Sequence, residues 1–120
     1  MDNKEFSKQL ELRTKKFSIS VIRLSVQLPG SPEGKILRNQ LTKAGTSIGA
    51  NYREANRARS KADFVNKIRI SESEASETIY WLEIIDSLDW LNKEKTRTLL
   101  KEAAELLAIF TSIGKSSKNV

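Results

Sequence analysis

The sequence predicts an all-α fold, an antiparallel up-down-up-down four-helix bundle. Four stretches repeat apolar residues at alternating spacings of four and three, which places those residues on one face of a helix. Short connections separate the stretches, and short connections make successive helices antiparallel. The 120 residues, 38% of them apolar, suit a single core, so we expect one domain at residues 1–114 and a polar tail at 115–120.

The first segment covers residues 4–28 and supports two interpretations. Apolar residues also alternate between positions 17 and 28, which is typical of a strand. We predict a helix, because the helical spacing is long and the residues before it are strong helix formers. Its opposite side carries Ile19, Ile22 and Val26, which then need a second partner. The helical stripe consists of Leu10, Thr14, Phe17, Val21, Leu24 and Leu28.

The second segment follows a Pro/Gly loop at residues 29–34 and runs from about residue 35 to 59. Gly45 and Gly49 lie in its middle, and each costs up to ~1 kcal/mol relative to alanine in a helix interior. We interpret them as sites where another backbone comes close; a kink or a tolerated weak point is the alternative. The stripe consists of Leu37, Leu41, Ala44, Ile48, Asn51, Ala55 and Ala58.

The third segment begins at Ser60, where Ser60 and Asp63 have the spacing of a capping box. Its core stripe is Phe64, Ile68, Ser71, Ala75, Thr78, Leu82 and Ile85. A second stripe beside it contains Lys67, Ile70, Glu74, Glu77, Trp81, Ile84 and Leu88. Together the two stripes exceed the face that a helix buries in a monomer, so we predict contact with another subunit. The predicted oligomer interface consists of Ile19, Ile22, Val26, Ile70, Trp81 and Ile84.

The fourth segment starts near Asn92, a favourable N-cap residue. Gly114 is the expected C-cap, followed by the polar tail. The stripe consists of Thr96, Leu99, Ala103, Leu106, Phe110 and Ile113.

Composition excludes several kinds of enzyme. The chain has no histidine and no cysteine, which excludes thiol nucleophiles, disulfides, imidazole bases and metal sites built on either residue. Glu74 and Glu77 are inward carboxylates without an accompanying nucleophile. We therefore expect no enzyme activity, no metal and no cofactor. The N-terminus does not resemble a signal peptide and no stretch is apolar enough to span a membrane, so we expect a cytoplasmic protein without membrane contact.

Positive charge is concentrated in the first half of the chain. The net charge is +6, with a net charge of +7 in residues 1–60 and −1 in residues 61–120. Clustered Lys and Arg side chains bind phosphates without reading sequence; a solvated face is the alternative. Tyr52 either stacks on a base or packs at the helix edge. The predicted nucleic-acid contacts are Arg53, Arg57, Arg59, Lys61, Lys67 and Arg69.

Polar residues interrupt the apolar faces of the second and third segments. Asn51 occupies a core position of its repeat, and a polar residue there can fix register or oligomer state. An unpaired carboxylate within an apolar stripe is costly. We predict a structural polar layer; the alternative is that the carboxylates reach solvent at the edge of the face. The layer consists of Asn51, Glu54, Glu74 and Glu77.

A longer motif resembles a known family. Residues 45–55 read GTSIGANYREA, followed by SKADF at 60–64, Glu74 and Glu77, and Trp81-Leu82. This pattern resembles the bacterial four-helix bundle proteins, which are often encoded within intervening sequences of large-subunit rRNA genes. The resemblance implies a ring-like homopentamer. It also implies a distant similarity to the accessory protein of diversity-generating retroelements, which binds a reverse transcriptase and nucleic acid.

Together these observations predict a non-catalytic homo-oligomeric bundle, a pentamer if the resemblance holds. We expect it to bind RNA, DNA or a nucleic-acid-processing protein through its basic surface. The alternative is a protein–protein adaptor that binds no nucleic acid directly.

Overall fold

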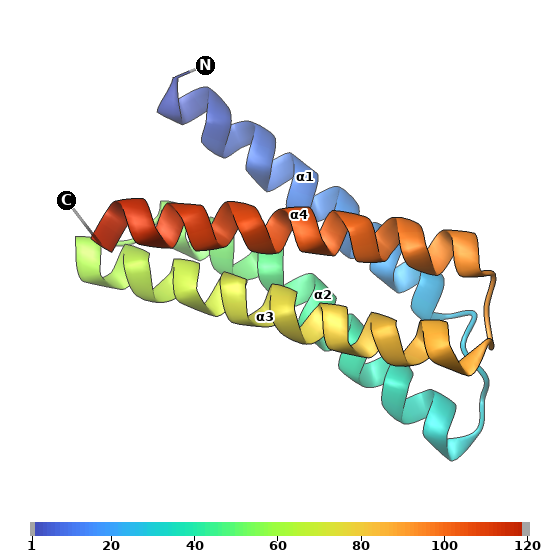
Figure 1. Ribbon diagram of the computed structural model, residues 1–120. Coiled ribbons are helices and arrows are strands. Elements are labelled where there is room, and N and C mark those ends of the chain that lie inside the picture. Colours follow the sequence, from blue (N-terminus) through green and yellow to red (C-terminus); the bar gives the residue numbers. More distant parts are fainter. Residues whose placement is uncertain (1, 119–120) are drawn as a thin grey trace.

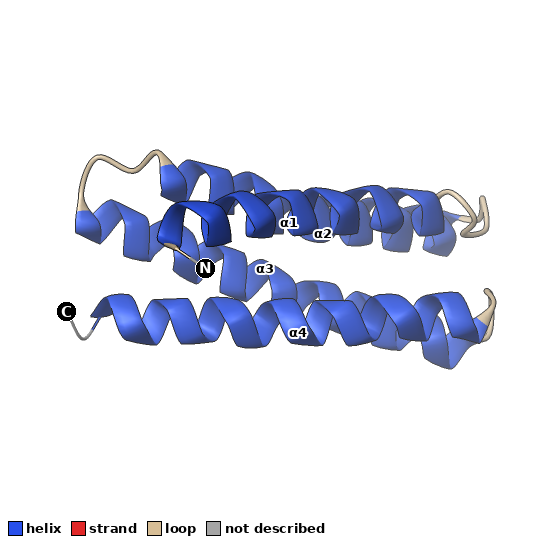
Figure 2. Ribbon diagram, turned by 90° about the horizontal axis from the view of Figure 1, so that it is seen from above, coloured by secondary structure: helices blue, strands red, loops and turns tan. Residues whose placement is uncertain are grey.

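A computed structural model describes residues 2–118 and shows four helices and no strand in that range. The helices are α1 (Asn3–Ser25), α2 (Pro32–Asn56), α3 (Lys61–Leu88) and α4 (Lys93–Lys118). They form an antiparallel bundle that measures 46 × 26 × 20 Å (Figures 1 and 2). The predicted fold class is confirmed, and the strand interpretation of the first segment is wrong.

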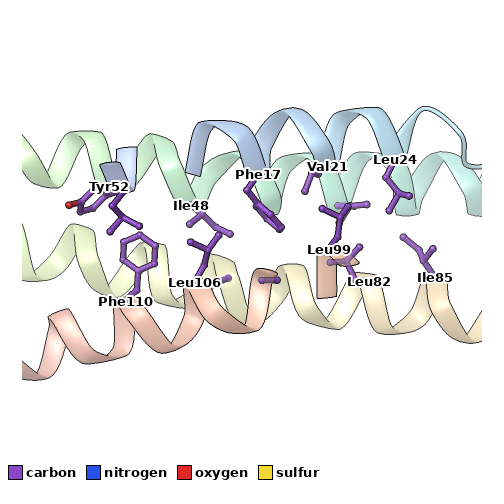
Figure 3. Packing of buried hydrophobic residues seen from close by; sticks show 14 of the residues in the cluster. Phe17, Val21, Leu24, Ile48, Tyr52, Leu82, Ile85, Leu99, Leu106 and Phe110 are labelled. Carbon is purple, nitrogen blue, oxygen red and sulfur yellow. The ribbon is translucent and has the colours of Figure 1, made fainter. Parts of the chain in front are cut away.

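The predicted apolar stripes form the core (Figure 3). Every residue of the α1 stripe is buried, and on α3 the six stripe residues after Phe64 are buried too. Phe64 is half-buried at the edge of the core. Four helices that each bury one stripe account for a single continuous core.

Side chains cap the N-termini of all four helices. Ser60 Oγ accepts a hydrogen bond from the backbone N–H of Asp63, and Asn92 Oδ1 accepts one from the backbone N–H of Glu94. These two caps were predicted and are confirmed. Pro32 opens α2 at a position where a missing N–H costs nothing. The remaining caps are Asp2 for α1 and Ser31 for α2.

The predicted C-cap at Gly114 is wrong. The helix α4 continues to Lys118, and Gly114 is buried within it. A Cβ at Gly114 would lie 3.1 Å from Cζ of Arg69, so the guanidinium of Arg69 occupies the space that a side chain would need. Residues 115–118 of the expected tail are therefore helical, and residues 119–120 lie outside the described part of the chain.

The two mid-helix glycines of α2 face α1. A Cβ at Gly45 would lie 2.7 Å from Cγ1 of Val21, and one at Gly49 would lie 2.9 Å from Oγ1 of Thr14. Both distances are too short for real contacts. The close approach predicted from the glycines is confirmed, and it brings α1 tightly against α2.

The opposite side of α1 is held more loosely. Its N-terminal half diverges from α4 (Figure 1). The link between these helices is polar: Arg13 donates through Nε and Nη2 to the two carboxylate oxygens of Glu102, each at 2.7 Å. Arg13 also lies 3.3 Å from Glu105. Residues of both helices line an open cleft at the end of the bundle where α1 begins and α4 ends.

Candidate nucleic-acid interface and subunit-contact faces

The predicted basic cluster lies at the end of the bundle where α2 turns into α3. Arg53 is in the last turn of α2, and Arg57 and Arg59 are in the connection. Lys61 opens α3, and these four residues are exposed. Lys67 and Arg69 lie further along α3 and are half-buried. The structure thus brings the first four residues together and separates the last two from the exposed end.

Arg69 is committed to the contact between α3 and α4. Its Nη1 donates to Glu72 Oε1 at 2.9 Å, and Glu72 Oε2 accepts a hydrogen bond from Thr111 Oγ1 at 2.7 Å. The bond from Thr111, followed by that from Arg69, lowers the pKa of Glu72 below its ordinary value. Because the Arg69 guanidinium also packs over Gly114, we remove it from the set of phosphate contacts that we propose.

Arg57 and Arg59 have the opposite character. Both are exposed, and neither guanidinium forms a hydrogen bond or ion pair with another residue in the part of the chain that is described. Arg53 has one loose partner, since its Nε lies 3.7 Å from Glu11 Oε1. Within the described residues, the positive charge of Arg57 and Arg59 is therefore not neutralised by an ion pair and remains available to an anion.

An open cleft of about 610 Å³ lies beside the basic cluster. Its surface is mainly apolar, and polar side chains of α1 and α4 line part of it together with Asn56 and Lys61. Phe6 and Phe64 give it apolar surface, and the Phe6 side chain is 40% exposed. The cleft can accept a flat or apolar group next to a phosphate.

Tyr52 does not offer its ring to a base. The residue is 2% exposed, and its ring meets that of Phe110 edge to face at 5.4 Å (Figure 3). Position 52 is one residue past the stripe position Asn51, which is why the periodicity placed it at the edge. Phe6 is the aromatic side chain at this end that remains accessible for stacking.

The residues of the predicted polar layer do not bond to one another within one chain. Asn51 donates to the backbone carbonyl of Ser47 in its own helix at 2.9 Å. Glu77 accepts a hydrogen bond of 3.4 Å from Trp81 Nε1, and Glu54 is exposed. Burial, followed by repulsion from Glu77, raises the pKa of Glu74, while Lys43 opposes the shift. Glu74 therefore lacks full compensation in the isolated chain.

The predicted subunit-contact residues fall on two faces. Ile19, Ile22 and Val26 lie outward on α1 and are 39%, 43% and 64% exposed. On α3, the remaining three predicted contacts are half-buried: Ile70, Trp81 and Ile84.

Sequence reasoning also missed other exposed apolar residues, among them Leu12 on α1 and Ile36 on α2, at 58% and 59%. The signal for Leu12 was its position seven residues before Ile19, which places it two turns away on the same face. Ile36 lies seven residues before Lys43, so these two residues also share one face of their helix.

The described residues lack the features of two other kinds of site. No group of three or more aspartate or glutamate side chains within residues 2–118 is placed to hold a metal ion. Over the same residues, none of the four helices has the length and apolar character needed to cross a bilayer.

Comparisons with known proteins point to one family. The model for the 23S rRNA-intervening sequence proteins matches residues 8–112. A solved structure from Bacteroides thetaiotaomicron, described as a protein of unknown function from the S23 ribosomal protein family, is 33% identical. The match covers 88% of this chain and 97% of the other, with a TM-score of 0.81. A search of curated proteins finds no match.

Proposed function

The chain belongs to the 23S rRNA-intervening sequence protein family, and we propose that it is a non-catalytic, homo-oligomeric nucleic-acid-binding bundle of the cytoplasm. The bound partner is RNA or DNA, held through phosphate contacts rather than base reading. The observation that supports this proposal most directly is the pair of exposed, unpaired arginines, Arg57 and Arg59, in the α2–α3 connection. Such groups release counterions when they meet a phosphate backbone.

The surroundings of these arginines support the same proposal. Arg53 and Lys61 extend the positive surface, and the neighbouring cleft exposes Phe6. An accessible aromatic ring beside basic side chains is the arrangement that binds single strands, because each base has a face that can stack. We therefore propose a preference for single-stranded over double-stranded nucleic acid.

A salt titration tests the proposal. Fluorescence anisotropy with labelled RNA and DNA oligonucleotides measures affinity between about 50 and 200 mM salt. The double variant Arg57→Gln/Arg59→Gln should weaken binding and lower the salt slope by about 1.5, the value for two lost phosphate contacts. The variant Phe6→Ala should weaken single-strand binding and leave the salt slope unchanged.

The matched control is Lys95→Gln/Lys101→Gln. The ammonium groups of these two exposed lysines of α4 have no partner among the described residues, and the change removes the same total charge. An equal loss in the control would show that net charge alone attracts nucleic acid. Absence of binding to any oligonucleotide at low salt would refute direct binding.

The cleft also favours one second candidate function, that of a protein–protein adaptor. Phe6 and Phe64 add apolar surface that phosphate contacts do not require. An acidic partner protein, such as one that processes nucleic acid, would use both this surface and the arginines. Capture of partners by the tagged protein, with and without nuclease, distinguishes the two functions: a partner retained after nuclease treatment supports the adaptor.

The oligomeric part of the proposal is a ring of five copies, and the number five rests on the family resemblance. The exposed outer residues of α1 support association itself, because apolar side chains concentrated on one face mark an interaction surface. Sedimentation velocity at micromolar concentration measures the mass. A single monomeric species would refute association.

A further inference from the structure

We propose that copies of this chain associate head-to-tail, with the outer face of α1 from one copy lying along the α3 side of the next. This inference rests on the proposed homo-oligomer and specifies which surfaces meet. The outer ridge is defined as Leu12, Ile19, Ile22 and Val26 of α1. The acidic stripe is defined by its residues on α3, which are Ile70, Glu74, Glu77, Trp81, Ile84 and Leu88.

The outer ridge is a row of apolar residues with basic residues beside it. Leu12, Ile19 and Val26 repeat every seven residues, so they lie in line on the side of α1 opposite the core. All four ridge residues are at least 39% exposed. Exposed basic residues flank them, and none has an ion-pair partner among the described residues: Lys8, Lys15, Lys16 and Arg23.

The acidic stripe has the complementary character. Trp81, Ile84 and Ile70 are half-buried, and Leu88 is 41% exposed. Glu74 and Glu77 lie among them without an ion pair in the described structure, although Lys43 of α2 acts on Glu74 electrostatically. Lys43 and Ile36, two turns apart, are both exposed on α2, the helix that packs against α3, and Ile36 adds apolar surface there.

Charge decides between the possible pairings. A symmetric contact of two outer ridges would bring the lysines of both copies together, within the distance at which charges still interact. A symmetric contact of two acidic stripes would bring four glutamates together. Ridge against stripe instead places lysines beside glutamates and apolar residues beside apolar residues. Complementary charge of this kind fixes which surfaces meet and suppresses the alternatives.

Length and polarity agree with that pairing. From Leu12 to Val26 the ridge spans about 21 Å, and from Ile70 to Leu88 the stripe spans about 27 Å, at 1.5 Å per residue. Three of the four basic residues lie in the first two-thirds of α1, and both glutamates precede Ile84 on α3. Matching charge to charge makes α1 of one copy parallel to α3 of the next.

Parallel pairing is also the arrangement that a ring requires. Within one copy α1 and α3 already run in the same direction, because they are alternate helices of an up-down-up-down bundle. A neighbour rotated about an axis along the bundle keeps that direction. Since the two surfaces differ, the contact is heterologous, and heterologous contacts close into rings when the rotation permits.

Crosslinking tests the pairing directly. The chain contains no cysteine, so single cysteines report single positions. One set of variants carries a cysteine at Leu12, Ile19 or Val26, and a second set at Ile36, Ile84 or Leu88. A short bismaleimide should link chains from different sets when they are mixed and allowed to exchange subunits. Links within one set, with none between the sets, would overturn the proposal.

Charge reversal provides a second measurement that does not depend on crosslinker reach. Both Lys15→Glu/Lys16→Glu and Glu74→Lys/Glu77→Lys should weaken association about 100-fold or more, because like charges then face each other. The quadruple variant should recover most of the association. Circular dichroism establishes that each variant folds. If reversal on one face alone leaves association intact, the proposal is wrong.

The outcomes separate this proposal from the proposed function. A chain that remains monomeric refutes both the ring and the pairing. An oligomer that crosslinks only within one set refutes the pairing and leaves the oligomer standing. Loss of nucleic-acid binding in the Arg57→Gln/Arg59→Gln variant, with unchanged crosslinking between the sets, tests the binding site alone, because neither arginine belongs to either face.

Discussion

The two sides of α1 carry similar apolar residues, but one side is buried and the other is exposed. On the inner side, Phe17, Val21 and Leu24 are at most 3% exposed, packed against the core. On the outer side, Ile19, Ile22 and Val26 are 39% to 64% exposed. The fold of one chain explains the inner side completely, because burial of that stripe stabilises the bundle. It gives no reason for apolar residues on the outer side. Their presence there therefore points to a contact with another molecule.

The largest expected effect contrasts one residue from each side. The variant Phe17→Ala should lower the free energy of unfolding by about 3–5 kcal/mol, because it leaves a cavity in a packed core. The variant Ile19→Ala should change the unfolding of the subunit itself by less than about 0.5 kcal/mol, as exposed positions do. Denaturant unfolding followed by circular dichroism measures both.

The dependence of unfolding on protein concentration gives a second way to compare Phe17→Ala with Ile19→Ala. Self-association stabilises the folded state by mass action, so the unfolding midpoint should rise with concentration. Phe17→Ala should lower the midpoint at every concentration, whereas Ile19→Ala should reduce only its dependence on concentration. If Ile19→Ala destabilises the chain equally at all concentrations, the outer side contributes to the subunit and the contrast between the two sides fails.

Local sequence signals predicted most of the inner side. The stripes, the caps at Ser60 and Asn92, and the close approach at Gly45 followed from periodicity and from the needs of helix ends. Gly114 and Tyr52 were misplaced, because their environments depend on residues distant in sequence: Arg69 fills the space above Gly114, and Phe110 meets Tyr52. Periodicity describes one helix at a time and carries no such information.

The candidate interfaces were predictable to a different extent. Most of the outer residues of α1 and of the basic cluster could be found from the sequence, because the former recur at helical spacing and the latter are concentrated in a short stretch. The ion-pair partners of individual charged side chains could not be found from the sequence. Arg69 binds Glu72 on its own helix, which the sequence left open, and Arg13 binds Glu102 across 89 positions. The Arg13–Glu102 pair depends on how α1 and α4 are rotated against each other, and spacing within one helix does not determine that rotation. The spacing of three residues within α3 permits the Arg69–Glu72 pair without requiring it.

The next effect concerns how closely the inner side of α1 approaches α2. The variant Gly45→Ala should destabilise the chain by about 1–2 kcal/mol. Overpacking against Val21 costs about 1–3 kcal/mol, and the better helix propensity of alanine returns up to ~1 kcal/mol. Thermal unfolding measures the change, and Val21→Ala combined with Gly45→Ala should recover part of it.

The matched control is Gly30→Ala. No atom lies within 4 Å of a Cβ built at Gly30, and its φ angle is not positive. Alanine there should be neutral or should stabilise by about 0.4–1 kcal/mol through the unfolded chain. If Gly45→Ala and Gly30→Ala had the same effect on thermal stability, α1 and α2 could move apart at Gly45 without cost.

A smaller effect is expected where α1 meets α4. Arg13 and Glu102 are 38% and 28% exposed, so solvent screens their ion pair. The variant Arg13→Lys keeps the charge and loses the two-pronged geometry, and it should cost less than about 1 kcal/mol. The cost should fall further at high salt. A loss as large as that of Gly45→Ala would show that the polar contact, rather than the packing on α2, holds α1 in place.

Glu74 should make the stability of the subunit depend on pH. Because burial raises the pKa of Glu74 in the folded chain, this group contributes stability that is complete below its unfolded pKa and lost as pH rises through its folded pKa. Ionised Glu74 therefore weakens the isolated subunit at neutral pH, and Glu74→Gln should stabilise it there, with the difference vanishing as pH falls below the ordinary glutamate range near about 4.3. Glu83→Gln, at an exposed position of the same helix, removes the same charge and serves as the control. Association should respond in the opposite direction, since we propose that the carboxylate of Glu74 meets lysines of the next copy. A variant that is more stable as a subunit and weaker as an assembly would separate the two functions of this surface; a Glu74→Gln chain that associates as well as the original would remove Glu74 from the contact.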